Sequence, residues 1–227
     1  MTVLAADLSP GYFITGTDTE VGKTFATCAL LRRLAVAGRR VAAMKPVAAG
    51  LDEHGRNEDV EALLAAANVR CARERVNPYA FASPIAPHLA AREEGREIRF
   101  APILRAFAAL AGEADGVLVE GVGGFRVPLG SDGDAADLAV ALGLPVILVV
   151  GLRLGCINHA LLTVEAVRAR GLRLAGWIGN CATADMARRE ENVATLRELI
   201  AAPLLGVLPH LTPADPAAAA AFLDLPS

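Results

Sequence analysis

The stretch Gly16-Thr-Asp-Thr-Glu-Val-Gly-Lys-Thr24 decides the fold of this chain. An apolar run at residues 12–15 precedes the stretch, and a helical pattern of apolar residues follows it. A glycine-rich turn between a strand and a helix is the setting of a phosphate-binding loop, in which backbone N–H groups face an anion. There Lys23 adds a charge beside the β- and γ-phosphates, and the Thr24 hydroxyl can bind Mg²⁺. Although Gly-Lys-Thr also occurs by chance, its setting here predicts a P-loop.

The loop departs from the usual pattern in its length. Five residues separate Gly16 from Gly22, whereas the usual P-loop has four residues between its glycines. Thr17 stands at the usual position of the first glycine. The Gly22-Lys23-Thr24 end is unchanged, so we still expect phosphate binding.

Apolar runs alternate with helical patterns along the rest of the chain, which predicts βαβ units. We expect strands at residues 12–15, 41–44, 117–119, 145–150, 175–178 and 204–208. We expect helices at residues 24–37, 58–67, 103–111, 157–170 and 186–200. The pattern predicts an α/β fold of the P-loop NTPase type, a mostly parallel sheet flanked by helices. Residues 1–227 form one expected domain, with weakly specified termini at residues 1–10 and about 215–227.

Composition and charge argue against several other classes of protein. Apolar residues make up 54% of the chain, which indicates a globular protein rather than a disordered one. The net charge of −3 would not attract nucleic acid or an acidic membrane, so we expect neither as a partner. The cysteines lack metal-binding spacing, no apolar run is long enough to span a bilayer, and residues 1–10 do not resemble a signal peptide. These features favour a cytoplasmic location.

Polar and glycine-rich residues follow each expected strand, and parallel strands bring such residues to one edge of the sheet. Glu120 ends a buried strand and precedes Gly-Val-Gly-Gly, which favours a metal ligand where the backbone approaches a substrate closely. The alternative for Glu120 is a surface carboxylate. Asp59 begins a helical pattern, and residues 56–59 could simply cap that helix. The residues alone therefore favour Glu120 as a metal ligand and leave Asp59 open.

A set of motifs resembles those of the dethiobiotin synthetase family. The motifs occur in order from about Tyr12 to Leu211, so the resemblance covers nearly the whole chain. The P-loop alone indicates only a superfamily. The motifs below that begin at Lys45 and at Val149 narrow the resemblance to this family. The motifs are Gly16–Thr24 with Glu20 inside it, Lys45-Pro-Val-Ala-Ala-Gly50, Asn77-Pro-Tyr-Ala-Phe81 with Ser83-Pro-Ile-Ala-Pro-His88, Val119-Glu-Gly-Val-Gly-Gly124, Val149-Val-Gly-Leu-Arg-Leu-Gly-Cys-Ile-Asn-His159, Gly176-Trp-Ile-Gly-Asn180 and Leu205-Gly-Val-Leu-Pro209.

The resemblance implies an ATP-dependent cyclo-ligase that condenses CO₂ with 7,8-diaminononanoate to form dethiobiotin. One amine forms a carbamate, ATP phosphorylates the carbamate, and the second amine attacks the mixed anhydride, which closes the ureido ring and releases phosphate. The carbamate and the γ-phosphate are both anions, and Lys23 and Lys45 can bring them together from two loops. The expected substrates are therefore ATP, 7,8-diaminononanoate and CO₂ or bicarbonate, and the expected cofactor is Mg²⁺.

The resemblance also implies roles for individual residues. Lys45 matches the catalytic lysine beside the carbamate, and Lys23 is the second expected catalytic cation. The residues alone would instead favour Lys45 as a surface lysine at the end of a strand. The expected metal ligands are Thr24, Asp59 and Glu120. The expected ATP-binding residues are Glu20, Val21, Gly22, Lys23, Thr24, Phe25, Asp59, Glu120, Gly121, Val122, Gly123, Asn180, Cys181, Pro209, His210 and Leu211. The expected substrate-binding residues are Thr19, Lys45, Ala49, Gly155, Cys156 and Asn158.

Two of these groups also suit their roles chemically. The resemblance implies that Asn180 recognises the adenine edge, and an amide side chain can both donate and accept there. Gly155, Cys156 and Asn158 begin a helix, and a helix N-terminus favours an anion. The resemblance implies that this helix start binds the substrate carboxylate across the interface of a homodimer.

The chain departs from the family pattern at three positions. Ala49 stands where many members carry Ser or Thr, so one substrate hydrogen bond is missing or comes from water. Arg153 stands where Lys is frequent, which keeps the charge but changes its geometry. Cys181 stands where an acid is common, which leaves the nucleobase preference open.

Two other functions stay open at this point. A carboxyl-activating synthetase of the kind used in cobyrinate amidation usually carries a glutaminase domain, for which we expect no room in 227 residues. A ParA/MinD-like ATPase switch usually carries a second lysine early in the loop, where this chain has Thr17-Asp18-Thr19. The dependence of ADP release on diaminononanoate and bicarbonate discriminates among the three.

Overall fold

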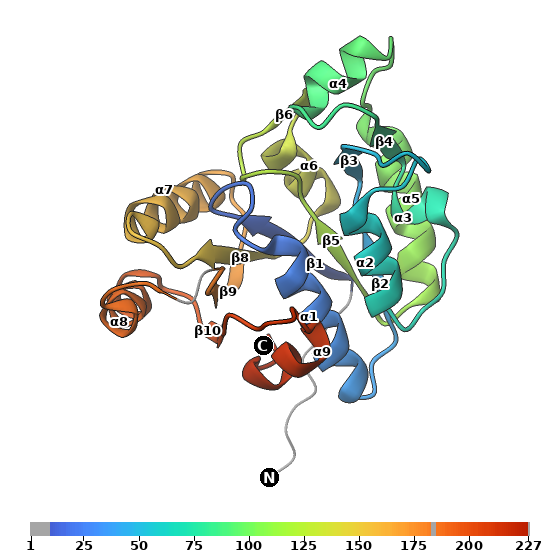
Figure 1. Cartoon of the computed structure of the whole chain (residues 1–227). Helices are drawn as coiled ribbons and strands as arrows, with labels where there is room; N and C mark the ends of the chain where they lie inside the picture. Colours follow the sequence, from blue (N-terminus) through green and yellow to red (C-terminus); the bar gives the residue numbers. More distant parts are fainter. Residues whose placement is uncertain (1–9, 183–184, 227) are drawn as a thin grey trace.

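A six-stranded parallel sheet forms the centre of the computed structural model, which describes residues 10–182 and 185–226. The strand order is β10-β9-β8-β1-β5-β2 (Figure 1). The strands are β1 (Gly11–Gly16), β2 (Val41–Met44), β5 (Gly116–Glu120), β8 (Val146–Gly151), β9 (Leu174–Asn180) and β10 (Leu204–Leu208). Because β1 lies between β8 and β5, the loop that follows it opens at the middle of the carboxyl edge of the sheet.

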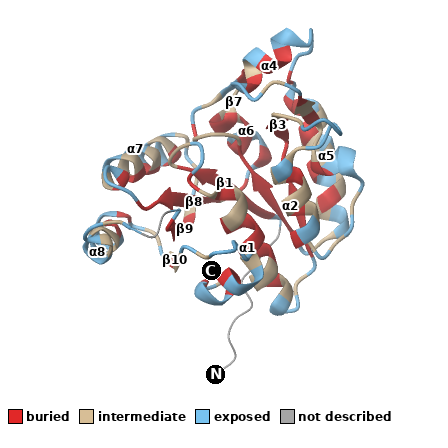
Figure 2. Ribbon diagram, viewed as in Figure 1, coloured by how far each residue is buried: buried red, intermediate tan, exposed pale blue. Residues whose placement is uncertain are grey.

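Helices cover both faces of this sheet. The longer ones are α1 (Lys23–Val36), α2 (Glu58–Ala66), α5 (Phe100–Glu113), α6 (Ala135–Leu142), α7 (Cys156–Ala169) and α8 (Arg189–Leu199). Alternation along β1 divides the core: Tyr12 and Ile14 pack with α1 and α2, whereas Phe13 packs with α5 and α6. The strands are almost entirely buried, and the exposed residues lie on the outer sides of the helices (Figure 2).

Short elements build the rim above the carboxyl edge. β3 (Val47–Ala49) pairs in parallel with β4 (Tyr79–Phe81), and β6 (Pro128–Gly130) pairs antiparallel with β7 (Gly133–Asp134). The remaining helices are α3 (Arg73–Val76), α4 (Pro87–Glu93), α9 (Pro216–Ala219) and the 3₁₀ helix η1 (Ala220–Phe222). α4 stands at the far end of this rim, at the top of Figure 1.

The structure confirms the α/β fold and each of the expected strands and helices, whose ends shift by at most three residues. The short rim elements and α6 were not expected. α6 has only eight residues, but it begins with a capping box in which the side chains of Asp134 and Asp137 each accept the other's backbone N–H. Its pattern of small apolar residues has no polar face, so helical periodicity does not reveal it.

The C-terminal segment forms α9 and η1 against α1, although its alanine-rich sequence specifies little. The Asp215 side chain accepts hydrogen bonds from the N–H groups of Ala217 and Ala218 and so begins α9. Ala219 and Leu223 are buried in the same core cluster as α1. The expected weak N-terminal segment lies outside the described residues except for Pro10. In the ranges 10–182 and 185–226, no helix has the length and hydrophobicity needed to cross a membrane.

Candidate functional site

The phosphate loop joins β1 to α1, as expected. Gly22 precedes α1 in the left-handed conformation, with φ 85°. Glu20 also has a positive φ, 59°, without being a glycine, which is a strained conformation for a residue with a Cβ. Two left-handed residues thus turn the longer loop onto the start of the helix.

Lys23 begins α1 and is 7% exposed. Its Nζ donates a 3.0 Å hydrogen bond to the carbonyl oxygen of Asp18 across the loop. Burial, assisted by the nearby cation of Lys45, lowers the pKa of Lys23 to about 8. An arriving phosphate would stabilise the charged form, because an anion favours the ammonium. The side chain is therefore held where it can neutralise a bound phosphate.

Thr24, Asp59 and Glu120 converge from three separate segments, as expected for a metal site. The Thr24 Oγ1 lies 2.6 Å from Asp59 Oδ1 and 2.8 Å from Glu120 Oε1. Asp59 belongs to the first turn of α2, and Glu120 ends β5. Glu120 is fully buried, so the alternative of a surface carboxylate is wrong. Asn57 caps α2 through its side chain, so Asp59 is not needed as the cap.

Lys45 lies between the two carboxylates. Its Nζ is 2.8 Å from Asp59 Oδ2 and 2.6 Å from Glu120 Oε1, and its side chain is 4% exposed. Lys45 is therefore not a surface lysine. Burial alone would lower the pKa of Lys45, but the Glu120 and Asp59 carboxylates outweigh it and raise that pKa. Burial would raise the pKa of Asp59, but Lys45 holds it below its usual value, so both side chains are charged at neutral pH.

The oxygen ligands of this cluster suit Mg²⁺, which prefers hard carboxylate and hydroxyl donors. Glu120 Oε2 is buried and has no hydrogen-bond partner within the described residues, so it has a lone pair available for an ion. No group of three or more His, Cys, Asp or Glu that could hold a metal occurs in the part of the chain that the structure describes. Thr24, Asp59 and Glu120 supply three oxygen ligands, so the site fits an ion that completes its coordination with phosphate oxygens or water.

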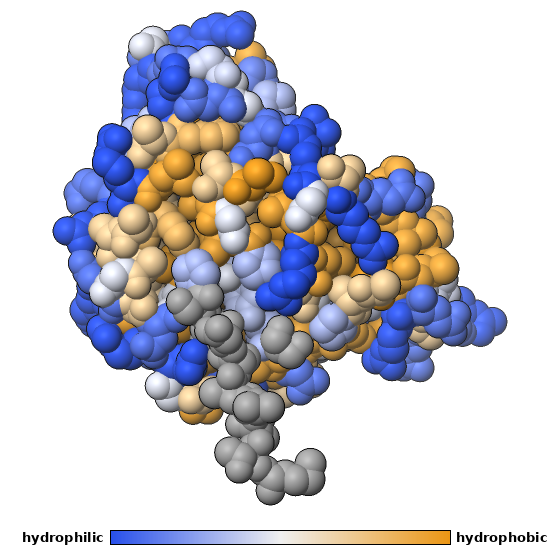
Figure 3. All heavy atoms as spheres, turned by 180° about the vertical axis from the view of Figure 1, so that it is seen from behind, coloured by the Kyte–Doolittle hydropathy of each residue, from blue (hydrophilic) through white to orange (hydrophobic). Residues whose placement is uncertain are grey.

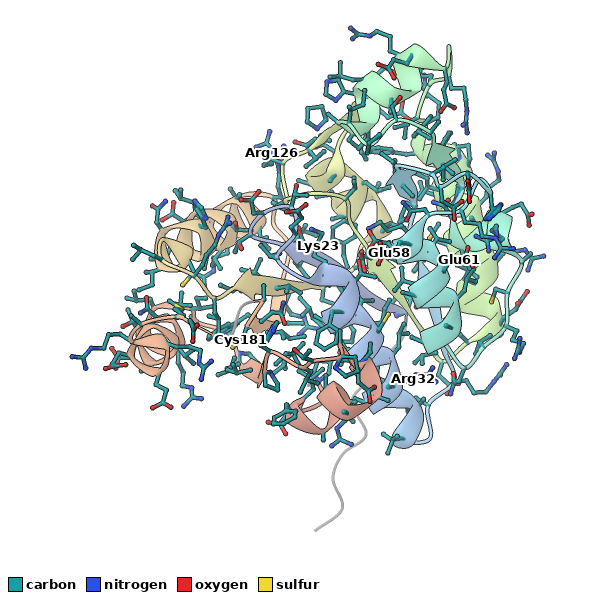
Figure 4. The ribbon with its side chains drawn as sticks, viewed as in Figure 1. Lys23, Arg32, Glu58, Glu61, Arg126 and Cys181 are labelled. Carbon is teal, nitrogen blue, oxygen red and sulfur yellow. The ribbon has the colours of Figure 1, made fainter. Side chains whose placement is uncertain are left out.

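A cleft of about 850 Å³ opens above the cluster. One wall is the segment 84–87 that leads into α4, and Arg126 contributes from the loop after β5. Figure 4 shows Lys23 at the start of α1, with Arg126 on the rim beyond it. The expected site residues that line the cleft are Thr19, Glu20, Gly22, Lys23, Thr24, Lys45, Ala49, Asp59, Val122 and Gly123.

Two polar lining residues, Asn57 and Arg126, were not expected as site residues. The Asn57 side chain accepts from the N–H of Val60 at 3.3 Å and donates to the carbonyl of Gly50 at 2.8 Å, which ties α2 to the segment after Lys45. Its place before Glu58 is a helix-capping signal that could have revealed it. Arg126 follows the glycine-rich stretch 121–124, and its Nε donates to Asp134 Oδ2 at 2.5 Å. Nothing in its sequence context indicates that pairing.

The expected nucleobase residues lie at the carboxyl ends of β9 and β10. Asn180 is 4% exposed, and its Nδ2 donates a 2.9 Å hydrogen bond to the carbonyl of Val21 in the phosphate loop. Cys181 and Pro209 line a second cavity of about 430 Å³ together with Arg189 of α8. Two further expected residues follow Pro209: His210 is exposed, and Leu211 is partly buried against the α1 core. Elsewhere among the expected ATP-binding residues, Phe25 of α1 is also partly buried against that core, and Gly121 after β5 lies against the ring of Phe13.

Gly155, Cys156 and Asn158 lie at the start of α7 and do not line the cleft of their own chain. Gly155 has φ 93°, Cys156 is 1% exposed, and Asn158 is exposed. Arg153, just before them, pairs with Asp18 of the phosphate loop at 2.7 Å. The structure thus brings the expected metal residues together with most of the phosphate loop, but it leaves this part of the expected substrate site apart from Lys45.

Comparisons with known proteins support one family. A family model described as an AAA domain matches residues 10–218. The chain is 58% identical over 218 residues to the ATP-dependent dethiobiotin synthetase BioD of Aromatoleum aromaticum, with 95% of this chain and 97% of the relative covered. It is 56% identical to that of Ralstonia nicotianae, covering 94% of each chain, and 52% identical to that of Nitrosospira multiformis, covering 96% of each.

Solved structures show the same fold at much lower identity. The MinC–MinD cell division complex of Aquifex aeolicus matches with a TM-score of 0.55 and 18% identity, covering 92% of this chain and 85% of that chain. A ParA family ATPase of Chlorobium tepidum matches with a TM-score of 0.51 and 13% identity, covering 88% and 85%. These likenesses concern the fold alone and do not favour an ATPase switch.

Proposed function

The chain belongs to the ATP-dependent dethiobiotin synthetase family, and we propose that its cleft forms dethiobiotin from 7,8-diaminononanoate, CO₂ and ATP. It is an ATP-dependent ligase of biotin biosynthesis. The observation that carries this proposal is the convergence of Lys45, Asp59 and Glu120 beside the phosphate loop. Lys45 and Asp59 of this cluster line a cleft large enough for a nucleotide and a short diamine acid.

The two lysines stabilise different anions in the proposed reaction. Lys23 faces the terminal phosphates of ATP, and Lys45 faces the carbamate that forms on one substrate amine. The carbamate oxygen attacks the γ-phosphorus and ADP leaves. The second amine then attacks the carbamoyl carbon, and inorganic phosphate departs with the transferred oxygen. Neither lysine is consumed, because both act through charge and position.

Mg²⁺, when bound by Thr24, Asp59 and Glu120, would neutralise charge on the phosphates of ATP. The two carboxylates hold Lys45 in place through their 2.6 and 2.8 Å contacts. Their negative charge also keeps Lys45 protonated despite its burial. A protonated Lys45 cannot compete with the substrate amines as a nucleophile, which protects the reactive anhydride from a side reaction.

The substrate carboxylate binds in this proposal to the start of α7 of a second subunit, in a homodimer. Asn158 is exposed and, like Gly155 and Cys156, does not line the cleft of its own chain, so this helix start can serve a neighbouring chain. Leu154, just before α7, is 95% exposed, and Leu162 on α7 is 58% exposed, which suits contact with another protein surface. Apolar side chains also gather across the side opposite to the view of Figure 1 (Figure 3).

ADP release by the purified protein tests the proposed function. We expect release to require ATP, diaminononanoate and bicarbonate together, with dethiobiotin formed in equal amount. ADP release that is independent of the diamine would contradict the proposal and favour an ATPase switch. The proposed cytoplasmic location is tested separately by cell fractionation.

A further inference from the structure

The side-chain amide of Asn180 connects the base side of the site to the phosphate loop. Asn180 ends β9, and its Nδ2 donates a buried 2.9 Å hydrogen bond to the main-chain carbonyl of Val21, 159 residues earlier in the chain. Because the partner is a carbonyl, the atom that faces it must be the amide nitrogen. The orientation of the amide therefore follows from its partner.

Two glycines make room for this contact. A Cβ on Gly22 would lie 2.1 Å from Nδ2 of Asn180, and a Cβ on Gly151, at the end of β8, would lie 2.9 Å from Cγ1 of Val21. Val21 itself is 3% exposed. The tip of the phosphate loop is thus packed closely onto the ends of β8 and β9, and Asn180 supplies a polar contact within that packing.

The loop needs such a contact because it is longer than usual and contains a strained residue. The left-handed φ of Glu20, 59°, is unfavourable for a residue with a Cβ, so surrounding contacts must maintain it. Val21 and Gly22 connect Glu20 to Lys23 and Thr24. A displacement of the Val21 carbonyl would therefore move the two side chains that face the phosphates and the metal.

We propose that Asn180 is a positioning residue for the phosphate loop, acting through Nδ2 on Val21, in addition to the contact with adenine that the family resemblance implies. This inference rests on the proposed role of the loop in binding ATP. The two roles use different atoms of one side chain. Nδ2 is engaged by Val21, which leaves Oδ1 to accept from the exocyclic amino group of the base.

Magnesium tripolyphosphate, which has no nucleobase, separates the two roles in isothermal titration calorimetry. Asn180→Leu keeps the approximate shape of the side chain but removes the donor, so the buried Val21 carbonyl loses its partner. We expect tripolyphosphate to bind about tenfold more weakly, and ATP to lose at least as much affinity because it also loses the acceptor Oδ1. We expect Asn180→Ala to weaken the binding of both ligands as well. This variant replaces Asn180→Leu in the test if circular dichroism shows that the leucine variant is not folded.

Asn68→Leu is the matched control. Asn68 also bridges two main-chain groups, the N–H of Val41 and the carbonyl of Arg39, but does so away from the cleft. We expect its affinity for both ligands to equal that of the wild type.

Two outcomes would overturn the positioning role. If the Asn180 variants lose affinity for ATP but not for tripolyphosphate, Asn180 contacts only the base. If they bind both ligands like the wild type, the contact with Val21 does not position the loop. Failure of the wild-type protein to bind either ligand would instead contradict the proposed function, and the inference with it.

Discussion

At the scale of single residues, the sequence around Lys45 gives little indication of where its side chain lies. It follows a four-residue strand, where lysines are usually solvated, yet it lies buried between the carboxylates of Asp59 and Glu120. Lys23 lies in the same cleft, but burial gives it a lowered pKa whereas the carboxylates raise that of Lys45. The different environments of the two ammonium groups lead to different expectations for their loss.

Removal of each lysine should affect a different step. Lys23→Ala should weaken ATP binding and lower turnover together, because Lys23 faces the phosphates. Lys45→Ala should leave the Kd for ATP within about threefold while turnover falls at least a hundredfold, as expected for lost electrostatic stabilisation of a transition state. Calorimetry for ATP and steady-state kinetics measure the two quantities. An equal loss of ATP affinity in both variants would contradict this division of roles.

Removal of the Asp59 carboxylate should raise the Mg²⁺ requirement. Asp59→Asn takes a charged oxygen from the cluster with Thr24 and Glu120, so we expect the Mg²⁺ concentration for half-maximal activity to rise roughly tenfold or more. Glu58→Gln is the matched control, since it removes the same charge from the exposed neighbouring residue (Figure 4). Wild-type activity of Asp59→Asn at limiting Mg²⁺ would show that Asp59 is not a metal ligand.

The affinity for ATP should depend on pH through Lys23. Its pKa of about 8 means that the free protein loses this cation as the pH rises through 8. Bound phosphate favours the protonated form, so binding above pH 8 should take up a proton and weaken by up to about tenfold per pH unit. Calorimetry in buffers of different ionisation enthalpy measures the uptake. Lys23→Met should show no such dependence between pH 8 and 10.

At the scale of elements, the fold could be predicted wherever a strand or helix carried its own periodic pattern. The P-loop context also placed Thr24 and Glu120 at one edge of the sheet, since parallel strands end there. The rim could not be predicted in this way, because strands of two or three residues such as β3 and β6 show no periodicity. Contacts between side chains far apart in sequence, such as Asn180 with Val21, leave no local pattern at all.

The cap of α2 should matter for both stability and metal binding. Asn57 begins α2 and ties it to the Gly50 carbonyl, and α2 carries Asp59 in its first turn. Asn57→Ala should lower the free energy of unfolding by about 1 kcal/mol, measured by chemical denaturation. It should also raise the Mg²⁺ requirement, because Asp59 loses part of its support. A loss of stability without any change in the Mg²⁺ requirement would limit Asn57 to a structural role.

At the scale of the whole molecule, one chain does not complete the proposed site. The cleft contains Lys45 and the phosphate loop, whereas the start of α7, with Asn158, does not line it. A C₂ dimer would place two equivalent composite sites at one interface. Each site would then combine the lysines of one subunit with the α7 start of the other.

Complementation between two inactive variants tests this arrangement. Lys45→Ala removes the catalytic cation, and Asn158→Glu places a negative charge where the substrate carboxylate is proposed to bind. In a mixed dimer both lesions fall in one site and the other site is intact. After subunit exchange, we expect about one quarter of the wild-type activity, since half of the dimers are mixed and each has one intact site. Mixed dimers without any activity would contradict a shared site.

The oxygen transfer from bicarbonate to phosphate tests the central claim most directly. In the proposed reaction a carbamate oxygen attacks the γ-phosphorus and leaves with it, so that oxygen comes from CO₂ and not from water. This oxygen can be followed in a rapid single turnover with ¹⁸O-labelled bicarbonate in unlabelled water, with the products analysed by mass spectrometry. We predict that the released phosphate carries one ¹⁸O atom and that dethiobiotin is formed in equal amount. Unlabelled phosphate, with its new oxygen taken from water, would identify simple ATP hydrolysis and contradict the account.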